Sequence, residues 1–242
     1  MKQICPQGLF VTGTDTGVGK TVVSATLLST LRLGGCDAVP MKPVQTGCVK
    51  RQGRWIAPDL EFCLKEAGLK PSQTERGDMA PYCFRPACSP HLAAARAGVS
   101  IRSSVIRRAF RRLSRAHEFV VVEGAGGLHV PLNKQETMLD LMVAMGLPIL
   151  LVARSGLGTI NHTLLSLQAL RGAKLEVLGV ILNQSTPGPW GFVENDNLLV
   201  IERMGAVKVL ACIRHGDTLP TLQPVVRAQA LRSRSFRAES QS

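Results

Sequence analysis

Short runs of apolar and β-branched residues alternate along this chain with segments in which apolar positions recur at helical spacing. The first pattern is typical of buried β-strands and the second of amphipathic helices. The strand-type runs cover residues 8–11, 38–44, 119–122, 149–153, 177–182 and 207–212, and the helical segments cover residues 21–33, 59–67, 90–97, 159–170 and 197–204. Continuous apolar strands that alternate with helices predict an α/β fold, with a mostly parallel β-sheet and helices on both faces.

Length and composition fit one globular domain. The chain has 242 residues, of which 45% are hydrophobic and 19% charged, and a domain usually takes about 100–200 residues. We find no internal repeat and no linker-like stretch, so we predict a single domain over residues 1–242. From about residue 226 the composition becomes polar and basic, which predicts a disordered tail over residues 226–242.

Neither export nor membrane insertion is expected. No run approaches the roughly 18–20 apolar residues that a membrane span needs, and Pro6, Gln7 and Gly8 interrupt the N-terminus where a secretory leader would be apolar. Seven scattered cysteines without a CxxC pair are typical of a reduced, cytoplasmic protein. Cys83 and Cys88 could be half of a zinc site, but no matching second half follows, so we expect no zinc.

The net charge of +12 would suit a nucleic-acid-binding protein. Arginine supplies 20 of the 29 basic residues, concentrated in residues 102–115 and in the tail. In residues 102–115 the apolar positions fall on one face and the arginines on the other, which predicts an amphipathic helix with a solvated basic side. Aromatic residues make up only 4% and offer little for base stacking. We interpret the charge as solvated surface; a polyanionic partner is the alternative.

The sharpest chemical signal is the segment FVTGTDTGVGKTVVSATLL, residues 10–28. A strand runs into a glycine-rich turn, and a helix opens at Lys20 and Thr21, as in loops whose backbone N–H groups surround phosphates. Lys20 would reach the terminal phosphates and the Thr21 hydroxyl would ligate Mg²⁺. Gly13 and Gly19 enclose five residues, where the common pattern has four. This motif narrows the prediction to a three-layer P-loop NTPase-like fold.

Two further motifs follow predicted strands. MKPVQTG, residues 41–47, brings Lys42, Gln45 and Thr46 to a strand end, where ligands of parallel sheets bind. FVVVEGAGGLHVPL, residues 119–132, places Glu123 directly after a buried strand, where it could hold Mg²⁺. Asp59 opens a helix after Pro58, and the sequence alone slightly favours the role of an N-cap or first-turn acid over a role in the site.

Polar residues also begin a helix or end a strand farther along the chain. ARSGLGTINHTLL, residues 153–165, is a glycine turn before a helix without a first-turn acid, which could receive a carboxylate. We interpret His162 in this segment as a structural or hydrogen-bonding residue rather than as a general base. Asn183 ends a strand and could read an adenine edge.

Together these segments resemble the dethiobiotin synthetases, which are ATP-dependent cyclo-ligases of biotin biosynthesis. The matching pieces are GTDTGVGKT, MKPVQTG, the Asp59-Leu60 helix start, PYCF, SPHLAA, VVEGAGG, GLGTINH and the strand end at Asn183. They occur in the family's order over roughly residues 8–184. The resemblance implies that 7,8-diaminopelargonate takes up CO₂ as a carbamate, that ATP phosphorylates the carbamate, and that the second amine closes the ring of dethiobiotin with loss of phosphate.

The resemblance also implies roles for individual residues. Lys20 and Lys42 match catalytic positions, and Thr21, Asp59 and Glu123 match positions associated with Mg²⁺. Nucleotide contacts are implied for Gly17, Val18, Gly19, Lys20, Thr21, Val22, Asp59, Glu123, Gly124, Ala125, Gly126 and Asn183. Substrate contacts are implied for Thr16, Thr46, Leu157, Gly158 and Asn161, the last three acting across the interface of a homodimer.

The chain departs from the family's pattern at two places. Gly17 stands where many members have glutamate, a change that we expect to be tolerated. Ile213-Arg214-His215-Gly216 replaces the usual Ile-Pro segment, so the preference for ATP over other nucleotides stays open. The basic tail has no counterpart in the family.

Two other classes share parts of the pattern. Partitioning ATPases have a KGGxGKT loop with an early lysine, but this chain has no lysine between Phe10 and Lys20. Cobyrinate-type amide synthases normally carry an attached glutaminase domain, for which 242 residues leave no room. A nucleotide-binding remnant without catalysis is the third alternative, and the presence of both lysines and both carboxylates argues against it.

Overall fold

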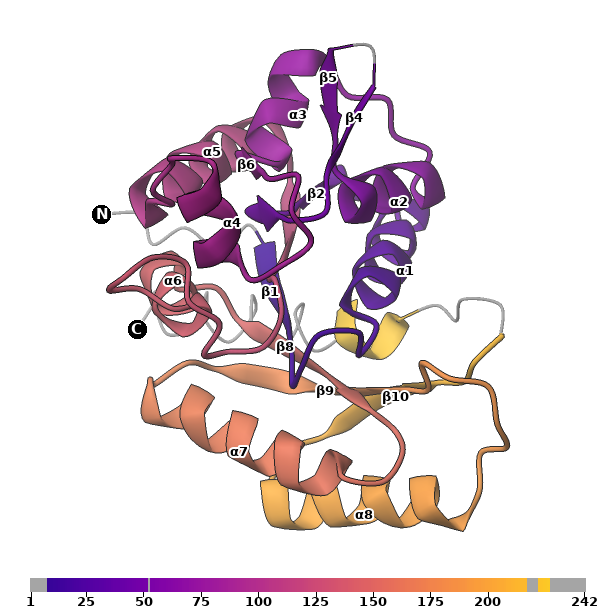
Figure 1. Cartoon of the computed structure of the whole chain (residues 1–242). Helices are drawn as coiled ribbons and strands as arrows, with labels where there is room; N and C mark the ends of the chain where they lie inside the picture. Colours follow the sequence, from indigo (N-terminus) through magenta and orange to yellow (C-terminus); the bar gives the residue numbers. More distant parts are fainter. Residues whose placement is uncertain (1–7, 52, 217–221, 227–242) are drawn as a thin grey trace, which may run out of the picture.

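A six-stranded parallel sheet forms the centre of the molecule, in the strand order β10-β9-β8-β1-β7-β2 (Figure 1). The computed structural model describes residues 8–51, 53–216 and 222–226. The sheet strands are β1 (Gly8–Gly13), β2 (Ala38–Met41), β7 (Phe119–Glu123), β8 (Ile149–Arg154), β9 (Val177–Asn183) and β10 (Val209–Ile213). The first strand of the chain therefore lies in the middle of the sheet, between β7 and β8.

Alternate residues of the central strands enter two different hydrophobic cores. On β1, Phe10 packs on one side, whereas Leu9 and Val11 pack on the other. This alternation follows from the two-residue period of a strand, and it explains why strands covered on both faces are continuously apolar. The sheet is thus the middle of three layers, and the predicted fold class is confirmed.

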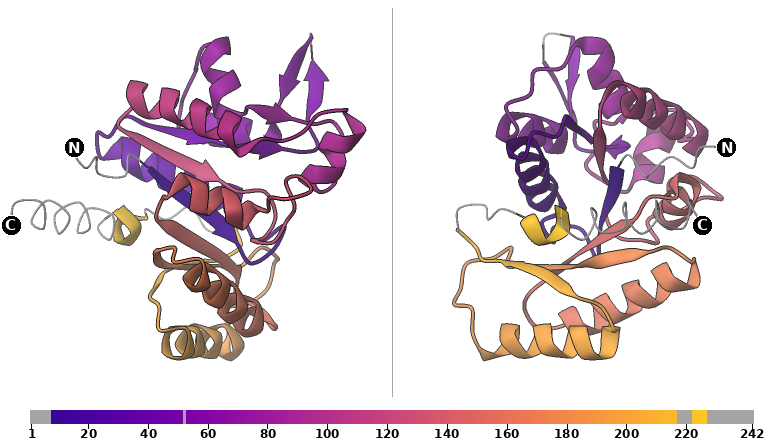
Figure 2. Two further views of the ribbon diagram at one scale, coloured as in Figure 1. Left: turned by 90° about the vertical axis from the view of Figure 1, so that its left-hand side faces the viewer. Right: turned by 180° about the vertical axis from the view of Figure 1, so that it is seen from behind.

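Helices cover both faces of the sheet (Figure 2). The helices are α1 (Lys20–Leu33), α2 (Pro58–Glu66), α3 (Gln73–Met79), α4 (Pro90–Arg96), α5 (Ser103–Ala116), α6 (Met138–Met145), α7 (Thr159–Gly172) and α8 (Phe192–Gly205). One face is covered by α1, beside which α2 packs, and residues 222–226 return to α1, where the Leu222 N–H donates to Thr30 Oγ1 at 3.0 Å. The other face is covered by α5, α6, α7 and α8.

Two small sheets stand apart from the central one. β3 (Val44–Gln45) pairs in parallel with β6 (Tyr82–Cys83), and β4 (Val49–Arg51) forms an antiparallel hairpin with β5 (Arg54–Ile56). The strand predicted over residues 38–44 is therefore wrong beyond Met41. Pro43 has no N–H for a ladder, and the Lys42 N–H donates to the Met79 carbonyl at 2.7 Å instead of continuing along β7.

Other differences from the predicted elements are additions or shifts. The sequence patterns missed α3, α6 and the β4–β5 hairpin, and α8 begins at Phe192 rather than at residue 197. The basic amphipathic helix is confirmed as α5, with Ile106, Ala109 and Leu113 buried. The predicted tail lies outside the described residues beyond Val226. Within the described ranges, no helix combines the length and apolarity that a bilayer span requires.

Candidate active site

The glycine-rich loop between β1 and α1 has the geometry of a phosphate-binding loop. Gly19 precedes the first residue of α1 with φ at +97°, and no side chain caps the N-terminus of this helix. A Cβ atom at Gly19 would lie 2.0 Å from Asn183 Nδ2, so only glycine fits. The uncapped N–H groups at the start of α1 are the donors that a phosphate group would use.

Lys20 is the first residue of α1, directly after this loop, and it is buried. Its ammonium group donates to the Asp15 carbonyl at 2.7 Å, and only 6% of the residue is exposed. Burial, and next the charge of Lys42, lower the pKa of Lys20 to about 8. Lys20 therefore keeps its proton at neutral pH, and a phosphate in the loop would stabilise that charge further.

Lys42, Asp59, Glu123 and Thr21 form one cluster beside the loop. The Lys42 ammonium lies 2.6 Å from Glu123 Oε1 and 2.8 Å from Asp59 Oδ2, and it also donates to the Gly124 carbonyl at 3.2 Å. The Thr21 hydroxyl donates to the same Glu123 oxygen at 2.8 Å. Residues far apart in the sequence thus converge on a single ammonium group.

The charges in this cluster stabilise one another. Burial by itself would lower the pKa of Lys42, but Glu123 and Asp59 outweigh that effect, and the pKa of Lys42 is raised. Burial would likewise raise the pKa of Asp59, but Lys42 outweighs it and the pKa of Asp59 is lowered. Lys42 is accordingly an ammonium ion, and Asp59 a carboxylate, at neutral pH.

Strand register brings the cluster together. Val11 of β1 is opposite Glu123, and Met41 of β2 is opposite Val122, so the three strands end side by side. Lys42 directly follows the end of β2, and Asp59 lies in the first turn of α2 after the N-cap residue Ala57. Asp59 is thus a first-turn acid, as the sequence alone favoured, and it is also an ion-pair partner of Lys42.

A pocket of about 640 Å³ opens over the loop and the cluster. The predicted site residues that line it are Thr16, Gly17, Gly19, Lys20, Thr21, Lys42, Thr46, Asp59, Glu123, Ala125 and Gly126. Thr16 and Thr46 belong to different loops of this lining, and Val44, Gln45 and Ser89 line it as well. The structure thus brings the three predicted metal ligands, most of the predicted phosphate-loop residues and two of the five predicted substrate residues to one cavity.

Four predicted nucleotide residues lie outside this lining. Val18, Val22 and Gly124 belong to the loop, to α1 and to the end of β7, and Gly124 contributes its carbonyl to Lys42. Asn183 is buried behind the loop, where its side-chain amide donates to the Val18 carbonyl at 2.9 Å. Its contact with an adenine ring stays a prediction.

The start of α7 lies apart from the pocket. Leu157 is 91% exposed, Asn161 is exposed, and Gly158 precedes the helix with φ at +88°. None of the three lines the pocket over the loop. The side chain of His162 is exposed and makes no hydrogen bond within the described part of the chain. The helix N-terminus has neither a first-turn acid nor a side-chain cap, so its amide groups are available to an anion.

The donor set of the cluster fits Mg²⁺. Thr21 supplies a hydroxyl, and Asp59 and Glu123 supply carboxylates within 2.8 Å of the same ammonium group. Hard oxygen ligands, of which one or two are carboxylates, are the set that Mg²⁺ takes beside phosphate groups. The three predicted metal ligands therefore belong to one cluster of ion pairs and hydrogen bonds, and their coordination of Mg²⁺ stays a prediction.

Sequence patterns missed one contact at the phosphate loop and one beyond the end of β10. Arg154, at the end of β8, forms an ion pair with Asp15 of the loop at 3.0 Å. Arg214 lies over the Trp190 ring at 5.9 Å, in the segment that departs from the family's Ile-Pro pattern. The partners in each pair are far apart in sequence, so no local motif could have indicated them.

Known proteins resemble the chain along most of its length. A family model described as an AAA domain matches residues 7–221. An ATP-dependent dethiobiotin synthetase of Anoxybacillus flavithermus is 39% identical over 92% of this chain and 98% of that protein. One from Anaeromyxobacter dehalogenans (strain 2CP-C) is 45% identical over 75% of this chain and 78% of that protein. A bifunctional biotin biosynthesis protein of Bordetella avium is 41% identical over 94% of this chain, which spans 46% of it.

Solved structures agree on the fold. The MinC:MinD complex of Aquifex aeolicus contains a chain that matches with a TM-score of 0.58 and 11% identity, over 94% of this chain and 95% of that one. The signal recognition particle receptor FtsY of Elizabethkingia anophelis matches with a TM-score of 0.56 and 17% identity, over 95% of this chain and 66% of that one. At such low identities these likenesses show the fold alone. The family match and the identity to full-length relatives place this chain in the family of ATP-dependent dethiobiotin synthetases.

Proposed function

We propose that this chain is a dethiobiotin synthetase, which uses Mg-ATP and CO₂ to convert 7,8-diaminopelargonate to dethiobiotin, with release of ADP and phosphate. The observation that carries the proposal is the Lys42 ammonium, held by Asp59 and Glu123 at the edge of a pocket that also contains the phosphate loop. Family membership supplies the substrate class, and this geometry supplies charge where a phosphoryl group would be transferred.

The reaction that we propose forms a carbamate on one amine and phosphorylates it. The second amine then displaces phosphate and closes the cyclic urea. Such chemistry needs positioned reactants and cations near the γ-phosphoryl group more than covalent catalysis by the protein. Lys20 reaches that group from the loop and Lys42 from the end of β2. Mg²⁺, held by Thr21, Asp59 and Glu123, would supply further positive charge.

The substrate would lie beside the loop. Thr16 and Thr46 line the pocket and offer hydroxyl groups to the diamine or its carbamate. The substrate also has a carboxylate, and the start of α7, which has neither a side-chain cap nor a first-turn acid, is the position that the family resemblance implies for it. We propose a homodimer in which the partner's Leu157, the partner's Gly158 and the partner's Asn161 hold this carboxylate.

The remaining nucleotide contacts follow the loop. The backbone from Gly17 to Val22 would surround the phosphates, Glu123 to Gly126 would flank them, and Asn183 would reach the adenine. We further propose a cytoplasmic location, because the scattered cysteines favour a reducing compartment. The basic face of α5 is taken as solvated, so no nucleic acid is expected as a partner.

The proposal is tested by ADP formation from Mg-ATP with and without 7,8-diaminopelargonate and bicarbonate, with the product identified by mass. We expect ADP release that depends on the diamine and a cyclic urea product. ATP hydrolysis that ignores the diamine but responds to DNA would contradict the proposal and indicate a partition-type ATPase. Binding of ATP without turnover, with or without the diamine, would indicate a nucleotide-binding remnant.

A further inference from the structure

Gln45 lines the candidate active site together with Lys42, Thr46 and Asp59. It belongs to β3, three positions after Lys42 and directly before Thr46, and 5% of the residue is exposed. Its backbone is held by β6, because the Phe84 N–H donates to the Gln45 carbonyl at 2.9 Å. Its side chain therefore belongs to the pocket lining, while its backbone is held by the pairing of β3 with β6.

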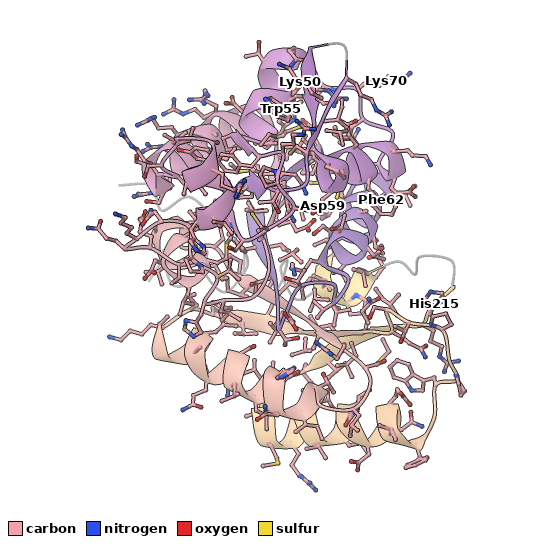
Figure 3. The ribbon with its side chains drawn as sticks, viewed as in Figure 1. Lys50, Trp55, Asp59, Phe62, Lys70 and His215 are labelled. Carbon is pink, nitrogen blue, oxygen red and sulfur yellow. The ribbon has the colours of Figure 1, made fainter. Side chains whose placement is uncertain are left out.

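The helix that carries Asp59 lacks a cap of its own. Its N-cap residue, Ala57, has no side chain that can accept a hydrogen bond, and Pro58, the first helical residue, has no N–H. The Asp59 N–H is thus a helix-terminal donor that needs a partner from elsewhere. Figure 3 shows Asp59 at the start of α2, nearer the centre of the molecule than Phe62 on the same helix.

The Gln45 side chain supplies that partner. Its Oε1 accepts the Asp59 N–H at 3.2 Å, and its Nε2 donates to the Thr46 carbonyl at 3.1 Å. We call these two hydrogen bonds the Gln45 bridge. Since the Asp59 carboxylate lies 2.8 Å from the Lys42 ammonium, α2 is attached to the Lys42–Thr46 segment at two points, by the bridge and by the ion pair.

We infer that Gln45 is a positioning residue, which holds the Asp59 end of α2 against the Lys42–Thr46 segment so that the phosphate and substrate sides of the pocket keep one geometry. The inference rests on the proposed function for its catalytic consequence, but not for the contact itself. The ion pair holds the Asp59 carboxylate, and the bridge adds a hold on the Asp59 backbone N–H, so the two attachments together fix both groups relative to the Lys42–Thr46 segment. Small displacements of catalytic groups are costly, with about 1 Å capable of costing about a hundredfold in rate.

The first test removes the acceptor and measures the contact directly. In Gln45→Met the side chain keeps its length but accepts no backbone hydrogen bond, and we expect the Asp59 amide to exchange with solvent at least about tenfold faster by NMR. The matched control, Gln135→Met, changes an exposed glutamine outside the pocket and should leave that exchange unchanged. Unchanged Asp59 exchange in Gln45→Met would overturn the inference.

The second test separates positioning from simple helix capping. Gln45→Met should lower kcat by about tenfold or more, with KM for Mg-ATP within about threefold of the wild type. Adding Ala57→Ser supplies a local cap, because Ala57 has extended backbone angles and its new hydroxyl can accept the Asp59 N–H. This double variant should recover the wild-type midpoint of thermal unfolding but not the wild-type kcat, since the local cap does not connect α2 to β3.

Recovery of both the midpoint and kcat in the double variant would overturn the inference, because Gln45 would then act only as a cap. A wild-type protein that makes no dethiobiotin, but whose Asp59 amide loses protection in Gln45→Met, would refute the proposed function while the contact stands. The amide exchange therefore tests the Gln45 contact, and the turnover tests the proposed function, independently of each other.

Discussion

Single residues of the site show how burial and neighbouring charge act in opposite directions on two lysines. Lys20 and Lys42 are both almost fully buried. Lys20 has a backbone carbonyl as its partner and its pKa falls to about 8, chiefly through burial, whereas the two carboxylates beside Lys42 raise its pKa despite burial. The chain thus holds one cation ready for an incoming anion and another already stabilised by the protein.

Replacing Lys42 should abolish turnover and also reduce stability. Lys42→Met removes a charge near the transferred phosphoryl group, and loss of such a group costs about 10²–10³ in kcat. It also leaves the buried Glu123 without its cation, and breaking a buried pair in this way costs about 3–5 kcal/mol of unfolding free energy. Thermal melting and the ADP assay measure the two effects.

The double variant Lys42→Met/Glu123→Gln serves as the control for Lys42. It removes the unpaired charge, so it should recover most of the lost stability without recovering turnover. Near-normal turnover in a folded Lys42→Met protein would show that Lys42 is not catalytic.

The lowered pKa of Lys20 predicts a pH-dependent difference in stability without nucleotide. Between pH 8 and 10.5 the unfolded chain keeps the proton on Lys20 and the folded chain loses it. The unfolded state then binds more protons, so the wild type gains stability from this group as the pH rises. The melting temperature of Lys20→Met, minus that of the wild type, should therefore be more positive at pH 7 than at pH 9.5. A difference that does not change with pH would contradict the lowered pKa.

At the scale of elements, His117 joins three segments at the edge of the molecule away from the pocket. It caps the end of α5, and its ring nitrogens lie 2.8 Å from Asp37 Oδ2, before β2, and 2.7 Å from Glu75 Oε1, in α3. Burial would lower the pKa of His117, but the two carboxylates outweigh it and the pKa is raised. Arg32 and Glu118 also contact Asp37.

His117→Gln should destabilise the protein more at pH 6 than at pH 8.5. Because the folded-state pKa lies above the ordinary value of 6.5, the stabilisation by the charged ring is complete below 6.5 and is lost as the pH rises through the folded-state value. Melting curves of variant and wild type at both pH values measure this effect. The control is His215→Gln, which changes an exposed ring. A decrease in melting temperature of His117→Gln that is equal at both pH values would argue against a charged His117 ring between Asp37 and Glu75.

Sequence patterns could predict the elements that local signals define. The strand, loop and helix over residues 8–33 carry such signals at every step, and the predicted site residues from Thr16 to Glu123, except Val18 and Val22, line one pocket. The helix α6 was missed although Thr137 and Asp140 form a capping box at its start. The Gln45–Asp59 and Arg154–Asp15 contacts span 14 and 139 residues, and they follow from how the sheet assembles, which no local pattern encodes.

At the scale of the whole molecule, strand order explains why the predicted site is divided in two. The ends of β1, β2 and β7 are adjacent and carry the phosphate loop, Lys42 and Glu123. The end of β8 lies on the other side of β1. The turn that follows β8 exposes Leu157 to solvent, and the first turn of α7 exposes Asn161. In the homodimer proposed above, the start of α7 would serve the pocket of the other subunit.

Mixed dimers test this division directly. Lys42→Met disables the pocket, and Asn161→Asp places a negative charge where the substrate carboxylate is proposed to bind, at a first-turn position of α7 where an acid does not disfavour the helix. Each homodimer should be inactive with the diamine. A two-fold dimer that mixes both variants contains one site with neither change, so an equal mixture should recover about a quarter of wild-type turnover per chain. Co-expression with two affinity tags isolates the mixed dimer, whose activity should be about half. If each site were complete within one chain, the mixed dimer would stay inactive, because every pocket would carry one of the two changes.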